Sequence, residues 1–196
     1  MKVLEVAGGT GRVMTFFRDN YPKMDATFLE LSPFYLEAAA KNDRYYRKWF
    51  SKYDKRSKDI EMKPLNLVQS KAEDMKEFEE DSFDILNCVY LFHEIPGDIR
   101  RQCAKEFFRV LKPGGIITFN DSIQVGDRDD RTNLGVFADR YNEPYYNSFI
   151  EEDLNEIFFE AGFKPGPTTP IIACSSKAMS WVKPTLEETQ HTVKEL

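Results

Sequence analysis

The stretch LEVAGGTGR, residues 4–12, places three glycines and a threonine directly after a short apolar segment. The apolar residues 3–6 predict a buried strand, and residues 13–20 suit a helix. A glycine-rich turn between a strand and a helix lets a ligand approach the backbone closely. The turn therefore predicts a ligand site, either for a pyrophosphate at the helix N-terminus or for an adenosyl group without phosphate.

The spacing of the glycines argues against the first of these ligands. The dinucleotide fingerprint is GxGxxG, and Met14 stands at its third glycine when the pattern starts at Gly9. A GxxxxGK[ST] loop is also absent from the sequence. Glu30 lies 19 residues after Gly11, at the end of a second apolar segment. Next to such a turn, a ribose-binding carboxylate is favoured over a solvated strand-end residue.

Apolar segments alternate with helical ones along the rest of the chain. Helices are expected to begin at Ser32, a good N-cap, and to cover residues 98–111 and 151–161. Further strands are expected at residues 65–69, 83–91, 116–119, 171–174 and 179–182. This alternation predicts an α/β fold with a parallel sheet, whose ligands bind beyond the carboxyl ends of the strands.

Composition narrows the class of protein. The 196 residues suffice for one domain with its own core, and the net charge of −6 argues against nucleic acid as the main partner. The three cysteines are far apart and lack zinc spacing, so we expect reduced thiols, no metal site and a cytoplasmic or organelle-matrix location. Neither a signal peptide nor a membrane-spanning stretch is expected.

Four segments in order resemble a class I S-adenosylmethionine-dependent methyltransferase: VLEVAGGTGR, TFLELSPFYLEAA, AEDM with DSFDILNCVYLFHEIP, and EFFRVLKPGGIITFNDS. The resemblance is to the subgroup that acts on small molecules, quinones and lipids. It implies a Rossmann-like α/β fold with a seven-stranded, mostly parallel sheet, an antiparallel last strand and helices on both faces. It places the domain at 1–183, with a charged and aromatic helical insertion at 43–64 and a polar tail at 184–196.

The resemblance also implies S-adenosyl-L-methionine as cofactor. Glu5 matches the acidic residue that approaches the methionine amino group, Glu30 the ribose-binding acid and Leu31 the apolar residue against adenine. The other cofactor positions it implies are Gly9, Gly11, Ala72, Glu73, Asn87 and Tyr90. Ala7 replaces the first glycine of the family pattern, and we expect a negative φ there because alanine carries a methyl group.

Methyl transfer from a sulfonium is an in-line displacement, and a base is needed when the acceptor is a hydroxyl or an acidic carbon. His93 follows the fourth expected strand and is the candidate base, with Glu94 to orient it; alternatively, His93 packs or caps the next helix. Residues after the fifth expected strand and in a later aromatic segment are candidates to contact the acceptor, or else turn formers and packing residues. They are Asp121, Gln124, Tyr145 and Tyr146.

The charged and aromatic segment offers two interpretations. Tyr45, Trp49 and Tyr53 recur every four residues, and most of the lysines and arginines lie off that stripe. Such a helix can rest on a membrane surface or bind an acidic partner. Packing of the aromatic side chains on the domain is favoured, because most amphipathic helices face a core.

The sequence as a whole predicts transfer of a methyl group to an oxygen or carbon of a small apolar or aromatic molecule. One alternative is a non-catalytic methyltransferase-like module, because the helices that usually precede the first strand are absent, so that an oligomer or partner would cover this side. The other is a nicotinamide-dependent enzyme, against which Met14 argues.

Overall fold

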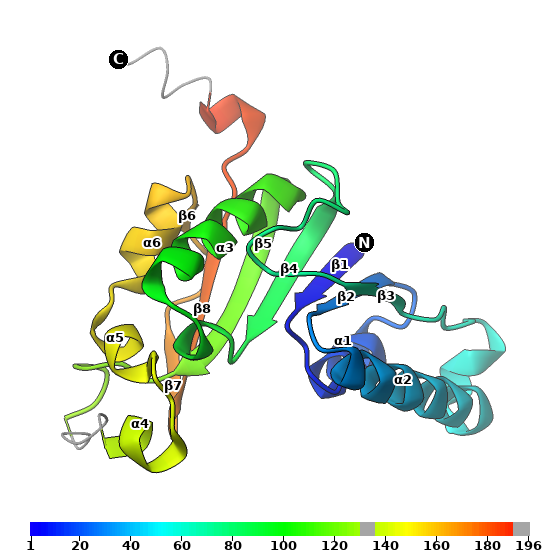
Figure 1. The fold of residues 1–196 in the computed structure, drawn as a ribbon. Helices are drawn as coiled ribbons and strands as arrows, with labels where there is room; N and C mark the ends of the chain where they lie inside the picture. The colour runs from blue at the N-terminus through cyan, green and yellow to red at the C-terminus, as the bar shows by residue number, and fades with distance from the viewer. Residues whose placement is uncertain (130–135, 190–196) are drawn as a thin grey trace.

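The computed structural model describes residues 1–129 and 136–189, and in them one eight-stranded sheet carries helices on both faces (Figure 1). The order is β3-β2-β1-β4-β5-β8-β6, and β7 pairs with β8. Neighbours among β1 to β5 run parallel, and β8 runs antiparallel to its three partners. The strands are β1 Lys2–Val6, β2 Asp25–Glu30, β3 Asn66–Gln69, β4 Phe83–Val89, β5 Leu111–Ser122, β6 Lys164–Pro165, β7 Ile171–Ala173 and β8 Ser176–Val182.

The helices pack in two layers because successive strand residues point to opposite faces of a sheet. Val3 packs in one apolar cluster with Met14 of α1 and Ala39 of α2, whereas Leu4 packs in another with Phe107 of α3 and Phe158 of α6. The helices are α1 Arg12–Asn20, α2 Pro33–Tyr53, α3 Gly97–Val110, α4 Val136–Tyr141, α5 Tyr146–Glu151 and α6 Leu154–Glu160, with 3-10 turns η1 Lys55–Lys58 and η2 Phe92–Glu94.

This architecture confirms the predicted fold class, including the antiparallel last strand, β8. The number of strands is eight rather than seven, because the two-residue β6, too short to leave a periodic pattern, also pairs with β8. The first part of the expected insertion, residues 43–53, continues α2 without a break. Of the expected tail, residues 190–196 lie outside the described residues.

No helix in the described part of the chain has both the length and the apolar character that a membrane span requires.

Candidate active site

The glycine turn between β1 and α1 uses backbone conformations that favour glycine. Gly9 and Gly11 have φ of 57° and 76°, and the Gly11 amide donates to the Gly8 carbonyl over 3.0 Å. A side chain at Gly8 would collide with the ring of Phe28, whereas nothing lies within 4 Å of the Cβ position of Gly9. Gly8 is therefore needed for packing, and Gly9 leaves the backbone open to a ligand. Sequence reasoning missed the role of Gly8, although it stands inside the glycine motif.

Ala7 corrects one expectation. Its φ is 53°, in the left-handed region, and not negative as predicted. The Ala7 amide donates to the carbonyl of Leu29 over 2.8 Å, so the residue extends the pairing of β1 with β2 while the chain already turns. Alanine occupies this conformation at a cost of about 1 kcal/mol relative to glycine.

Glu30 ends β2 and ties the glycine turn to the start of α2. Its carboxylate accepts hydrogen bonds from the Gly9 amide over 2.9 Å and from the Ser32 amide over 3.0 Å. A carboxylate has about four acceptor positions, so two remain for ribose hydroxyls. Leu31 is exposed directly after it, and its apolar surface can contact an adenine ring.

Glu5 lies on the face of β1 that α1 and α2 cover, and it is almost completely buried. One of its oxygens, Oε1, accepts a hydrogen bond from the Asn87 amide over 3.4 Å. The other oxygen, Oε2, has no hydrogen-bond partner among the described residues. Burial raises the pKa of Glu5 to about 8, against the smaller lowering effects of the Asn87 hydrogen bond and of the backbone amide of Met14 at the start of α1.

A buried carboxylate oxygen without a donor is costly unless a ligand supplies one. The methionine ammonium group of S-adenosylmethionine is such a donor, and Gly9, Glu30 and Leu31 present the remaining surfaces that this cofactor needs. The residues present therefore fit the cofactor that the sequence predicted.

The other predicted cofactor residues are placed as follows. Asn87 is next to Glu5 in the register of β1 and β4 and also accepts a hydrogen bond from the Thr118 hydroxyl over 2.9 Å. Ala72 is buried in the core, and Glu73 beside it is half-buried. Tyr90 has a φ of 55°, and its ring is 6.0 Å from the ring of His93, so it lies where the cofactor region meets an aromatic cavity.

This aromatic cavity, of about 520 Å³, opens at the ends of β4 and β5. Its lining includes Tyr90, His93, Ile123, Phe137, Tyr141 and Tyr146. Of the two predicted acceptor tyrosines, Tyr146 lines the cavity, whereas Tyr145 is outside the lining.

His93 lies in the short turn η2 and is buried beside Asp121. Its Nδ1 is 2.5 Å from Asp121 Oδ1, and the Asp121 carboxylate also accepts from the amides of Phe92 and Ser122 over 2.9 and 2.7 Å. Backbone amides donate to both Asp121 oxygens, so the carboxylate acts as a hydrogen-bond acceptor. We therefore assign the histidine proton to Nδ1, which leaves Nε2 as the acceptor of the ring. Asp121 therefore orients His93, a role predicted for Glu94, and does not face the acceptor.

Burial alone would lower the pKa of His93. The hydrogen bond and charge of Asp121, with the charges of Glu94 and Glu143, outweigh burial and raise the pKa above its ordinary value. Glu94 Oε1 is 3.7 Å from Nε2. Potential ligand atoms of His93, Glu94 and Glu143 lie within 4.8 Å of one another, so among the described residues these three side chains could also hold a cation.

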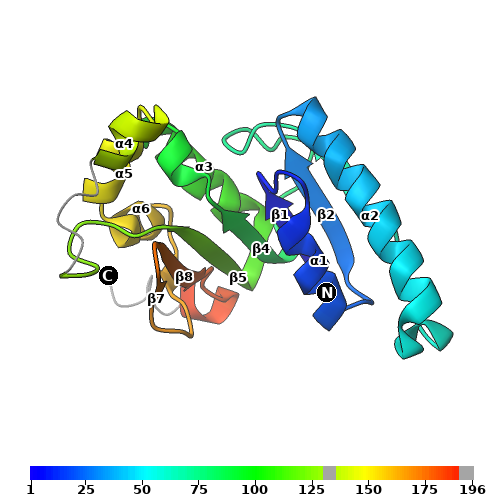
Figure 2. The same cartoon turned by 90° about the horizontal axis from the view of Figure 1, so that it is seen from below.

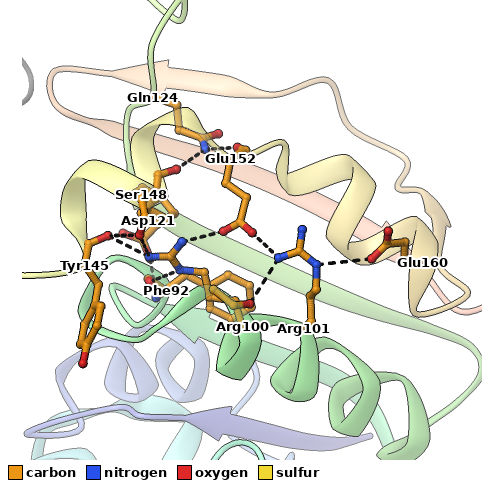
Figure 3. Close-up of polar contacts among 11 residues, drawn as sticks. Phe92, Arg100, Arg101, Asp121, Gln124, Tyr145, Ser148, Glu152 and Glu160 are labelled. Atoms are coloured by element: carbon orange, nitrogen blue, oxygen red, sulfur yellow. Dashed lines mark hydrogen bonds and ion pairs between the residues drawn. The ribbon is translucent and has the colours of Figure 1, made fainter.

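Arg100 of α3, which sequence reasoning missed, joins the turn of His93 to α5 (Figure 3). It is fully buried, and its Nε donates to the Phe92 carbonyl over 2.7 Å. Its two Nη atoms donate to the Glu152 carboxylate over 2.6 Å, the Tyr145 carbonyl over 2.9 Å and the Ser148 hydroxyl over 3.1 Å. The sequence signal that could have identified Arg100 is its position as a cation on the apolar face of a predicted helix.

Gln124 corrects another expectation. Its amide nitrogen donates to the carbonyls of Phe149 and Glu152 over 2.8 and 2.6 Å, and its oxygen accepts from Lys177 over 3.2 Å. The side chain therefore fastens the end of α5 to the residues after β5, and it is outside the lining of the aromatic cavity. Figure 3 shows Gln124 directed toward Glu152, with the Tyr145 ring pointing away from Arg100.

The fold and the open glycine turn define a class I S-adenosylmethionine-dependent methyltransferase domain. A model of the family described as "Methyltransferase domain" matches residues 4–119, and the chain belongs to this family. The chain is 32% identical over 116 residues to a ubiquinone/menaquinone biosynthesis C-methyltransferase, UbiE, of Bartonella quintana. This match covers 58% of the chain and 38% of that protein. The curated relatives it matches are thus covered over only 34–38% of their length.

Solved structures share the fold at low sequence identity. A SAM-dependent methyltransferase from Aquifex aeolicus is 14% identical with a TM-score of 0.65, and the match covers 93% of this chain and 82% of that one. An O-methyltransferase family protein from Burkholderia thailandensis is 15% identical with a TM-score of 0.71, and the match covers 94% and 51%.

Proposed function

We propose that the chain transfers a methyl group from S-adenosylmethionine to an oxygen or carbon atom of a small apolar or aromatic acceptor, with His93 as general base. The observation that carries this proposal is the position of His93: Asp121 holds it at the wall of an aromatic cavity, next to the residues that fit the cofactor. The name of the UbiE relative, which refers to quinones, supports an acceptor of this kind.

In this proposal the cofactor supplies a sulfonium methyl group as electrophile, and the chain supplies alignment. Glu5 would pair with the ammonium group, Glu30 would accept hydrogen bonds from the ribose, and the Gly9 backbone would leave room for close approach. Tyr90 and Tyr146 would confine the acceptor on the side of His93. Such alignment and exclusion of water are the main contributions an enzyme makes to an in-line displacement.

His93 Nε2 would take the proton that the acceptor hydroxyl or carbon loses, and Asp121 would stabilise the imidazolium that forms. Only neutral His93 can act as base. Because the pKa of His93 is raised, activity should fall as the pH drops through a value above that of an ordinary histidine. Asp121→Asn removes the charge that raises the pKa, so this acidic limb should move to lower pH.

The test measures methyl transfer to a panel of hydroxylated aromatic and quinol acceptors, with cofactor binding measured separately by calorimetry. His93→Gln should lower turnover about 10²- to 10⁴-fold while leaving the cofactor affinity unchanged. Tyr145→Phe, outside the cavity, is the matched control and should retain full turnover. Unchanged turnover in His93→Gln would rule out the base role. Binding of NADH in place of S-adenosylmethionine would overturn the whole proposal.

A further inference from the structure

The second half of α2 presents a row of exposed aromatic side chains, called here the aromatic ridge: Tyr45, Trp49 and Tyr53. Their exposed fractions are 75%, 40% and 63%. The ring of Trp49 stacks with Tyr46 at a centroid distance of 5.9 Å and lies 6.4 Å from that of Tyr53. The favoured prediction, that these aromatic residues pack on the domain, is therefore wrong.

The core needs only one side of α2. Its buried residues are Ala39, Asp43 and Phe50, which lie on the opposite side of the helix from Tyr45. Of the aromatic residues at 45–53, Phe50 alone is buried. The ridge is thus apolar surface that the described residues leave exposed.

The same segment is strongly basic. Residues 41–58 contain eight lysines and arginines and two aspartates, in a chain of net charge −6, so the remainder of the chain is strongly acidic. Asp43 and Asp54 pair with Arg47 and Arg56. Five further cations have no ion-pair partner among the described residues, namely Arg44, Lys48, Lys52, Lys55 and Lys58.

We propose that the aromatic ridge and its cations dock on an anionic phospholipid surface. Tryptophan and tyrosine favour the boundary between head groups and acyl chains, and nearby lysines and arginines are attracted to anionic lipids. α2 runs along the outer edge of the molecule (Figure 2), so a flat surface can contact its length. The acidic remainder of the chain is repelled by the same surface, which orients the molecule with the ridge toward the lipid.

This docking is independent of the proposed reaction and can be measured without an acceptor. In co-sedimentation, the chain should bind phosphatidylcholine vesicles that contain phosphatidylglycerol, bind pure phosphatidylcholine much more weakly, and dissociate as salt rises. Each cation near the surface contributes about fivefold to partitioning, so Lys48→Ala combined with Lys52→Ala should lower it about 25-fold. Trp49→Ser should also weaken binding.

Two substitutions elsewhere serve as controls. Lys105→Ala removes an exposed cation from α3, and Phe159→Ser removes an aromatic side chain with 44% exposure from α6. Neither should change binding to the anionic vesicles. Loss of binding in these variants equal to that in the α2 variants would overturn the assignment to α2.

Tryptophan fluorescence gives a second measurement. The chain has two tryptophans, and Trp181 is buried in the core. A change in tryptophan emission on adding vesicles therefore reports a change in the surroundings of Trp49. Anionic vesicles should shift the emission maximum of the native chain to the blue and leave that of the Trp49→Phe variant unchanged. Absence of both the shift and sedimentation would overturn the proposal, as would binding to RNA or to an acidic peptide without binding to vesicles.

Discussion

The two sides of the candidate active site differ in how their buried polar groups are satisfied. On the acceptor side, Asp121 uses both oxygens, and Arg100 donates to four partners. On the cofactor side, Glu5 is equally buried but keeps one oxygen without a partner among the described residues. The protein itself completes the acceptor side, whereas the cofactor side needs a ligand to complete it. Asp121 and Arg100 therefore stabilise the fold, whereas Glu5 lowers the stability of the empty site and is available for binding.

The largest expected effect is on the free energy of unfolding, when a buried donor of the acceptor side is removed. Arg100→Met should lower the free energy of unfolding by about 3–5 kcal/mol, because it leaves the Phe92 and Tyr145 carbonyls without this donor and weakens the neutralisation of Glu152. Urea unfolding measures the change. Arg101→Met is the matched control: that side chain pairs with Glu152 from a partly exposed position, so its loss should cost less than about 1 kcal/mol. Equal losses would show that burial of Arg100 is not the decisive factor.

The next largest effect is on cofactor affinity and concerns Glu5 on the cofactor side. Glu5→Gln should weaken S-adenosylmethionine binding about 100-fold, because glutamine cannot ionise to pair with the ammonium group. Calorimetry measures the affinity, and Glu73→Gln, which alters a half-buried carboxylate on another loop, is the control and should have a smaller effect. An unchanged affinity in Glu5→Gln would contradict the assignment.

The same variant should be more stable without cofactor at high pH. The folded-state pKa of Glu5, about 8, lies above its unfolded value, so its contribution is present below pH about 4.5 and is lost as pH rises through about 8. Glutamine does not ionise, so Glu5→Gln should exceed the native chain in stability by about 2–4 kcal/mol at pH 9. Unfolding at pH 5 and pH 9 measures the difference, which should nearly vanish at the lower pH.

The smallest effect concerns the backbone of the cofactor side. Ala7→Gly should raise the free energy of unfolding by about 1 kcal/mol, because glycine adopts a φ of 53° without the penalty of a Cβ. Ala38→Gly, inside α2, is the opposite control and should lower stability by about 1 kcal/mol. Destabilisation by Ala7→Gly would mean that the loss of chain entropy outweighs the relief of strain.

The sequence signals of the cofactor side are local. Gly9 and Gly11 mark a turn that needs positive φ, and Glu30 ends a continuous apolar segment. The contacts of the acceptor side join residues that are distant in the sequence, so the sequence gives no local signal for them. His93 and Asp121 are 28 residues apart, and they meet because β4 pairs with β5 in a register that places Val89 beside Asn120.

By itself, the sequence determined the alternation of strands and helices, the glycine turn, the acidic residues beside it and the position of His93 after a strand. Steric and periodic requirements act between neighbours in the chain, so neighbouring residues reveal them. Only the tertiary structure decided that Asp121 orients His93, that Gln124 and Arg100 hold α5, and that the aromatic ridge of α2 stays exposed. Each of these depends on which distant group satisfies a polar atom or covers an apolar surface, and strand register and helix packing settle that choice.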